Sequence, residues 1–159
     1  MGYYILFLPL AASIISGFFG KLIGDKASQL VTSLFVSVSA FLSVIILYNV
    51  ISTGYSENLI IATWINSGSL NVNWSVNIDP LSAVMLVVVT LVSAIVHIYS
   101  IGYMSHDPHK SRFMSYLSLF TFAMLTLVTS DNFIQLFFGW EGVGSVSYTH
   151  LTLPTILLV

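Results

Sequence analysis

One carboxylic acid lies in a part of the sequence where a charge is costly. Five of the six acidic residues fall in polar connecting segments, but Glu141 stands in an apolar stretch that begins near Phe133. Counted from a helix N-cap at Asp131 or Asn132, Glu141 lies about 14 Å along the helix, which is about half of the hydrocarbon thickness. A carboxylate at that depth must face the protein interior, pair with a cation or hold a proton. A group that changes between these states is suited to a proton path.

The surroundings of Glu141 favour a functional role over a purely structural contact between helices. Gly139, Gly142 and Gly144 remove side chains around it, so that backbone or water can come close. Gln135 lies on the approach from the outer end of the helix. No lysine or arginine falls at the same depth, so a cationic partner would have to come from another part of a larger protein. The structural alternative, a polar bridge between helices, stays open.

His97 is the second titratable candidate for proton transfer. It falls about two-thirds of the way along the apolar segment 81–103, and Tyr99, Ser100 and Tyr103 follow it. A series of titratable and hydroxyl groups can relay protons. A single histidine in a membrane also often just hydrogen-bonds a neighbouring helix, and the sequence does not decide between the two interpretations.

Metal and redox centres are not predicted in this chain. It has no cysteine, which excludes disulfides, thiolate metal sites and iron–sulfur ligation. His106 and His109 have suitable spacing for a metal, but they lack further ligands. A net charge of -2 without a basic patch gives no reason to expect nucleic acid.

The composition predicts an all-α membrane protein. Of 159 residues, 57% are hydrophobic and 6% are charged, whereas a soluble domain has about a quarter charged residues. A helix needs about 20 apolar residues to cross the hydrocarbon core. The uncharged runs give about five transmembrane helices: 3–19, 30–51, 81–103, 113–128 and one that begins near residue 133.

The connection between the second and third helices predicts a β-hairpin on the outer face. Residues 70–78 alternate apolar and polar side chains, and an apolar run at 59–65 precedes a turn-prone segment. Trp64 and Trp74 are expected to anchor its edge at the lipid headgroups. Asp79 and Pro80 then start the third helix, as N-cap and first helical residue.

All four basic residues fall in alternate connections of the chain. Lys21 and Lys26 lie between the first and second helices, and Lys110 and Arg112 between the third and fourth. The excess of positive charge marks the cytoplasmic or matrix side of a membrane protein. The N-terminus and the hairpin are therefore expected outside.

Several stretches together resemble a known family. They are DPLSAVM at 79–85, VHIYSIGYM at 96–104, RF at 112–113 and FGWEGVG at 138–144. The chain resembles, up to about Tyr148, subunit L of bacterial NADH:quinone oxidoreductase and chain 5 of mitochondrial complex I. The resemblance implies an N-terminal fragment of an antiporter-like, proton-translocating subunit at the distal end of the membrane arm, in the bacterial cytoplasmic or mitochondrial inner membrane.

The resemblance also implies partners, cofactors and residue roles. NADH, FMN, iron–sulfur clusters and quinone would bind to other subunits, and the partners would be the other membrane subunits of complex I and the lipid bilayer. Glu141 matches the family's helix-five glutamate, which pairs with a lysine on a later, broken helix. That lysine is not in this chain, so the fragment alone is not expected to move protons.

The expected organisation has four parts and two rival interpretations. Residues 1–51 form helices one and two, 52–79 the external loop, and 80–148 helices three to five with the start of the antiporter-like module. Residues 149–159 form a tail that departs from the family pattern. The rival functions are the large subunit of a multisubunit sodium/proton antiporter, and a non-transporting helical scaffold.

The alternating basic connections predict the membrane topology. A reporter fused at Gly54 should be external, and one fused at Ser111 should be internal. The measurement is the activity of paired reporters that work on opposite sides of the membrane. The reverse pattern would overturn the orientation but leave the number of helices unchanged.

Overall fold

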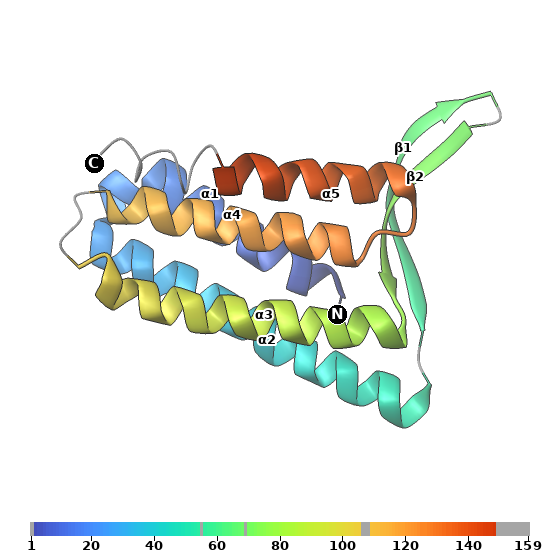
Figure 1. The fold of residues 1–159 in the computed structure, drawn as a ribbon, viewed down its shortest axis with the longest axis horizontal. Coiled ribbons are helices and arrows are strands. Elements are labelled where there is room, and N and C mark those ends of the chain that lie inside the picture. The colour runs from blue at the N-terminus through green and yellow to red at the C-terminus, as the bar shows by residue number, and fades with distance from the viewer. Residues whose placement is uncertain (1, 55, 69, 106–108, 149–159) are drawn as a thin grey trace.

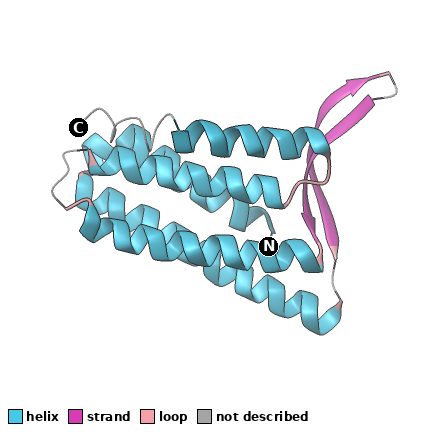
Figure 2. Cartoon of the chain, in the orientation of Figure 1, coloured by secondary structure: helices cyan, strands magenta, loops and turns pink. Residues whose placement is uncertain are grey.

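The structure is a bundle of helices with a two-stranded hairpin across one end (Figure 1). It is a computed structural model that describes residues 2–54, 56–68, 70–105 and 109–148. The elements in order are α1 (Gly2–Ile23), α2 (Asp25–Thr53), β1 (Glu57–Ser67), β2 (Leu70–Ile78), α3 (Pro80–Tyr103), α4 (Lys110–Val128) and α5 (Phe133–Ser145). The predicted helical fold, with a hairpin between the second and third helices, is confirmed (Figure 2).

Four of the described helices, α1 to α4, are long and apolar enough to cross a membrane. The α-helical part of α5 has 13 residues, which is about 20 Å. The tail at 149–159, which the sequence sets apart, lies outside the described residues.

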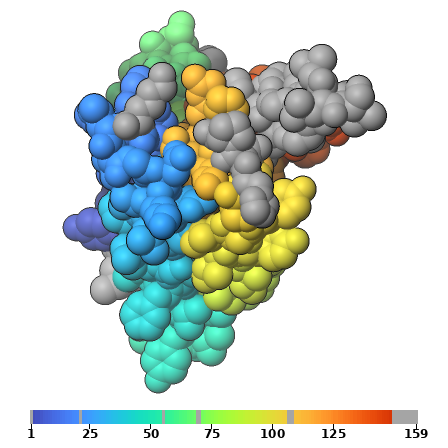
Figure 3. All heavy atoms as spheres, turned by 90° about the vertical axis from the view of Figure 1, so that its left-hand side faces the viewer, coloured from blue at the N-terminus to red at the C-terminus, as the bar shows by residue number. Residues whose placement is uncertain are grey.

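The turn between α1 and α2 consists of a single residue. Gly24 has a φ of 88°, which side chains other than hydrogen rarely adopt. This turn lies at the end of the bundle opposite the hairpin, beside the end of α3 and the start of α4 (Figure 3). Because Lys21, Lys26, Lys110 and Arg112 belong to these helix ends, the four basic residues all lie at one end of the bundle. The N-terminal end of α1 lies at the hairpin end.

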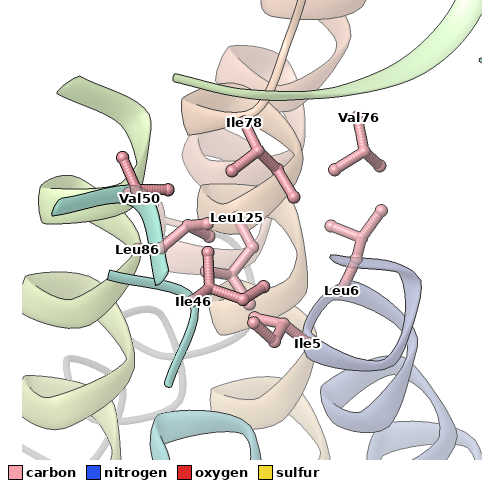
Figure 4. Close-up of a cluster of buried hydrophobic side chains, with 9 residues drawn as sticks. Ile5, Leu6, Ile46, Val50, Val76, Ile78, Leu86 and Leu125 are labelled. Atoms are coloured by element: carbon pink, nitrogen blue, oxygen red, sulfur yellow. The ribbon is translucent and has the colours of Figure 1, made fainter. Parts of the chain in front are cut away.

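The hairpin is packed into the end of the bundle. Strands β1 and β2 pair antiparallel, with two irregularities in the register. On β2, Val76 and Ile78 are almost completely buried, and they join a hydrophobic cluster with side chains of four helices, including Ile5, Ile46 and Leu125 (Figure 4). The hairpin is therefore part of the hydrophobic core at this end of the bundle.

Hydroxyl groups join neighbouring helices along the bundle. The contacts are Ser39 Oγ to the Ile5 carbonyl, Ser43 Oγ to Thr90 Oγ1 and Ser115 Oγ to the Ser13 carbonyl, each at 2.8 Å. They connect α2 to α1, α2 to α3, and α4 to α1. Such small side chains let the helix backbones come close while these hydroxyls form hydrogen bonds between helices.

Helix α3 begins with a reciprocal cap at the hairpin end of the bundle. Asp79 Oδ1 accepts a hydrogen bond from the Ser82 backbone N–H at 2.6 Å, and Ser82 Oγ accepts one from the Asp79 N–H at 2.8 Å. Pro80 occupies the first helical position. The bond from the Ser82 N–H lowers the pKa of Asp79 below its ordinary value of 3.8.

This cap predicts the effect of two substitutions on stability. Asp79→Ala should lower the free energy of unfolding by about 1 kcal/mol, because Ser82 N–H loses its acceptor, and Asp79→Asn should lower it less. The pKa of Asp79 is lower when folded, so its charge stabilises the fold above the unfolded pKa of 3.8. That stabilisation is lost as the pH falls through the folded pKa. Unfolding in detergent at pH 7 and under acidic conditions measures both effects, and identical curves for all three proteins at pH 7 would rule out the cap.

Candidate functional site

Helix α5 lies against α4 at the edge of the bundle (Figure 1). Gly139 is buried in this contact, where a β-carbon would come within 2.7 Å of the Leu127 nitrogen and 2.8 Å of its Cα. At Gly142 a β-carbon would meet that of Ala123 at 3.0 Å, and at Gly144 it would meet nothing within 4 Å. Of the three predicted glycines, Gly139 therefore permits the close backbone contact, Gly142 has little room, and Gly144 plays no part in it.

The N-terminal end of α5 is bound to the hairpin by two amide side chains. Gln135 is completely buried, and its Oε1 accepts from the Ser75 N–H at 3.0 Å while its Nε2 donates to the Ser75 carbonyl at 2.7 Å. Asn132 caps the helix at the Gln135 N–H, and its Nδ2 donates to the Asn73 carbonyl at 2.8 Å. The Gln135 amide thus pairs with β2 as a neighbouring strand would.

Three aromatic rings pack together beside these hydrogen bonds. The ring of Phe138 lies 5.8 Å from that of Trp64 and 5.0 Å from that of Trp74, in edge-on arrangements, and the two tryptophans are 5.2 Å apart. Edge-to-face pairs at these separations add to the stability of a contact. The two tryptophans join the hairpin to α5, and their place at the lipid headgroups stays a prediction.

The packing of α5 determines where Glu141 points. Glu141 follows Gly139 by two positions, which is a rotation of about 200° around a helix. Since Gly139 faces α4, Glu141 points almost directly away from it, and its side chain is exposed along with Phe137 and Trp140. Of the three expected alternatives, facing the interior is not seen for Glu141 within the described residues, and pairing with a cation or holding a proton stays a prediction. It lies among apolar side chains on a surface that these helices leave uncovered.

His97 is completely buried between α3 and α4. Its Nδ1 lies 2.7 Å from the Ser93 carbonyl, and its Nε2 lies 3.0 Å from Ser118 Oγ. Because a carbonyl can only accept, Nδ1 carries a hydrogen and a neutral ring accepts the Ser118 hydroxyl at Nε2. Tyr99 and Tyr103 are exposed and stack on each other at 5.9 Å. The contacts of the His97 ring are thus with Ser93 and Ser118, and its role in proton transfer stays a prediction.

A groove of about 320 Å³ between α3 and α4 lies beside the His97 cluster. Its walls are valine, leucine, methionine and phenylalanine side chains, apart from the hydroxyls of Ser93 and Thr121. These hydroxyls contact each other, and Ser93 also contacts His97. No titratable side chain lines the groove, and these two hydroxyls are its polar groups.

The described residues contain no group of three or more potential metal ligands among their histidine and acidic side chains. His106, one of the two histidines with suitable spacing, lies outside the part of the chain that the structure describes.

Gly139 and Gly144 form a matched pair for testing the contact of α5 with α4. Gly139→Ala should destabilise the protein by about 1–3 kcal/mol, because its β-carbon would overlap the Leu127 backbone. Gly144→Ala adds the same methyl group to open space and should be neutral or slightly stabilising. Thermal unfolding in detergent compares the two variants. Equal effects would show that α5 does not pack on α4 in this way.

Comparisons with known proteins agree with the motifs of the sequence. Residues 64–114 match the family model described as the N-terminus of NADH-ubiquinone oxidoreductase (complex I) chain 5. Over 91% of its length, the chain is 54% identical to chain 5 of Phytophthora infestans, 53% to chain 5 of Arabidopsis thaliana and 53% to NADH-quinone oxidoreductase subunit L of Rickettsia conorii. It spans 22% of the length of each of these relatives. The resemblance is thereby confirmed, and the chain is a relative of NADH-ubiquinone oxidoreductase chain 5 and NADH-quinone oxidoreductase subunit L, corresponding to about a fifth of their length.

Proposed function

We propose that this chain forms part of the proton-translocating membrane subunit of NADH:quinone oxidoreductase, in which Glu141 binds and releases the translocated proton. The similarity to chain 5 and subunit L supports the choice of complex. The oxidation of NADH and the reduction of quinone then take place on other subunits. The partners of this chain are the other membrane subunits and the surrounding lipid.

The observation that carries the role of Glu141 is its position on α5. It is the one acidic residue in the described part of the five helices that lies away from a helix end, since Asp25 begins α2. Glu141 is surrounded by exposed apolar side chains, so in a bilayer its charged form is costly without a counter-charge. A partner that brings a cation to this surface stabilises the carboxylate, and its withdrawal favours the protonated acid. Coupled movement of charge and proton follows from that alternation.

The direction of Glu141 supports a site shared with a further part of the protein. Its side chain points away from α4, and no described helix covers it. Lys26, Lys110 and Arg112 belong to the first turns of α2 and α4, whereas Glu141 is the ninth residue of α5. The proposed counter-charge, a lysine by the family resemblance, therefore belongs to a segment beyond these residues.

Substitution of Glu141 in the complete subunit, assembled in its complex, tests the proposal. Glu141→Gln keeps the size and hydrogen bonding but cannot titrate, so proton pumping per assembled complex should fall at least about tenfold. Glu141→Asp keeps the acid but draws it back by one methylene, so partial pumping is expected. The measurement is proton uptake into vesicles during NADH oxidation, corrected for the amount of assembled complex.

A matched control makes the same chemical change outside the membrane helices. Glu57→Gln, at the start of β1, should leave pumping unchanged. A structural role for Glu141 predicts that Gln is tolerated at least as well as Asp, because an amide still bridges helices. Normal pumping by the Glu141→Gln complex would therefore refute the proposal.

A further inference from the structure

We propose that Gln135 is a positioning residue that sets the rotation and depth of Glu141 through its amide pairing with the Ser75 backbone. This inference rests on the proposed function of Glu141. It gives the hairpin a role in proton transfer, because the hairpin supplies the frame against which α5 is oriented.

The pairing of Gln135 with Ser75 is directional and completely buried. Both polar atoms of the side chain are used, one as acceptor at 3.0 Å and the other as donor at 2.7 Å. Both backbone groups of Ser75 are satisfied by the same side chain. A rotation of α5 by even part of a turn would leave these four polar groups without partners, which is costly for buried groups.

Gln135 and Gly139 define the face of α5 that must point inward. They are four positions apart, or about 40° around the helix, so they lie on one face. Glu141 lies about 120° from Gln135 around the helix axis and about 9 Å farther along it. Once Gln135 is paired and Gly139 touches α4, Glu141 has one direction and one depth.

Gly139 alone does not fix that arrangement. Its contact with the Leu127 backbone is a van der Waals contact, which allows a helix to slide along its neighbour. The hydrogen bonds of Gln135 set the position along the axis, and the strand that they reach is itself held firmly. The Asn77 N–H donates to the Thr129 carbonyl at 2.9 Å, and Ile78 is buried in the core.

The test uses the complete subunit in its assembled complex. Gln135→Met keeps the length of the side chain but removes both hydrogen bonds, so pumping per assembled complex should fall roughly tenfold through misplacement of Glu141. The matched control is Ser75→Ala. Its backbone groups, which bind Gln135, are kept, and the Ser75 hydroxyl that it removes has no hydrogen-bond partner among the described residues. This control should pump normally.

Two readouts separate positioning from general destabilisation. The pH at which pumping is half-maximal should shift in Gln135→Met, because the surroundings of Glu141 change. Glu141 is the one titratable side chain on described α5. On the neighbouring helix α4, the titratable or charged residues are Lys110, Arg112 and Tyr116, which lie in the half farther from the hairpin. The loss caused by Gln135→Met should also differ in size between the native and the Glu141→Asp backgrounds, since the two residues act together.

The outcomes distinguish this inference from the proposed function. If Glu141→Gln abolishes pumping but Gln135→Met pumps normally, the positioning role is wrong and the function of Glu141 stands. If Gln135→Met lowers pumping by the same factor in the native and Glu141→Asp backgrounds and leaves the pH profile unchanged, the loss is structural and the positioning role is also wrong. Normal pumping by Glu141→Gln would refute both the proposed function of Glu141 and the positioning role of Gln135. Should Gln135→Met fail to assemble, Gln135→Asn, which keeps the amide but withdraws it from the Ser75 backbone by one methylene, is judged by the same criteria.

Discussion

The hydrocarbon core of a membrane offers no hydrogen bonds, so each polar group of this chain must find its partner within the protein. Many of the buried serine and threonine hydroxyls meet that requirement, although those of Ser33 and Ser75 have no partner among the described residues. Ser43 and Thr90 each bond to a carbonyl of their own helix and contact each other between α2 and α3. His97 meets it with one carbonyl and one hydroxyl. Gln135 meets it by pairing with a strand. The polar contacts that satisfy these groups also decide which helices are neighbours and how each one is turned.

Glu141 differs from Gln135 and His97 in where its side chain lies. Those two residues are buried and paired, whereas Glu141 stands on the face of α5 that points away from α4, among exposed Phe137 and Trp140. The same contacts that satisfy Gln135 and accommodate Gly139 turn it there. An acid held in this way depends on whatever covers that face for its charge state, and this dependence is what a coupled proton site requires.

The elements of the fold could be predicted from the sequence, but the contacts between them could not. Apolar runs and strict alternation are local patterns, so they indicated the helices and the hairpin, and the Asp79–Pro80 pair indicated the start of α3. The direction of Glu141, the Ser118 partner of His97 and the Ser75 partner of Gln135 depend on which helices lie side by side. Nothing in the periodicity encodes that choice, so the sequence could not show that Tyr99 and Tyr103 are exposed while His97 contacts Ser118.

The hydrogen bonds of the hairpin also have a consequence for biosynthesis. Ser75 and Gln135 are 60 residues apart, and Asn58 and Asp131 are 73 apart. The hydrogen bonds between the hairpin and the start of α5 therefore cannot form until the chain has been made as far as Gln135. Until then the Ser75 backbone groups lack the amide that pairs with them, although α3 and α4 have already been synthesised.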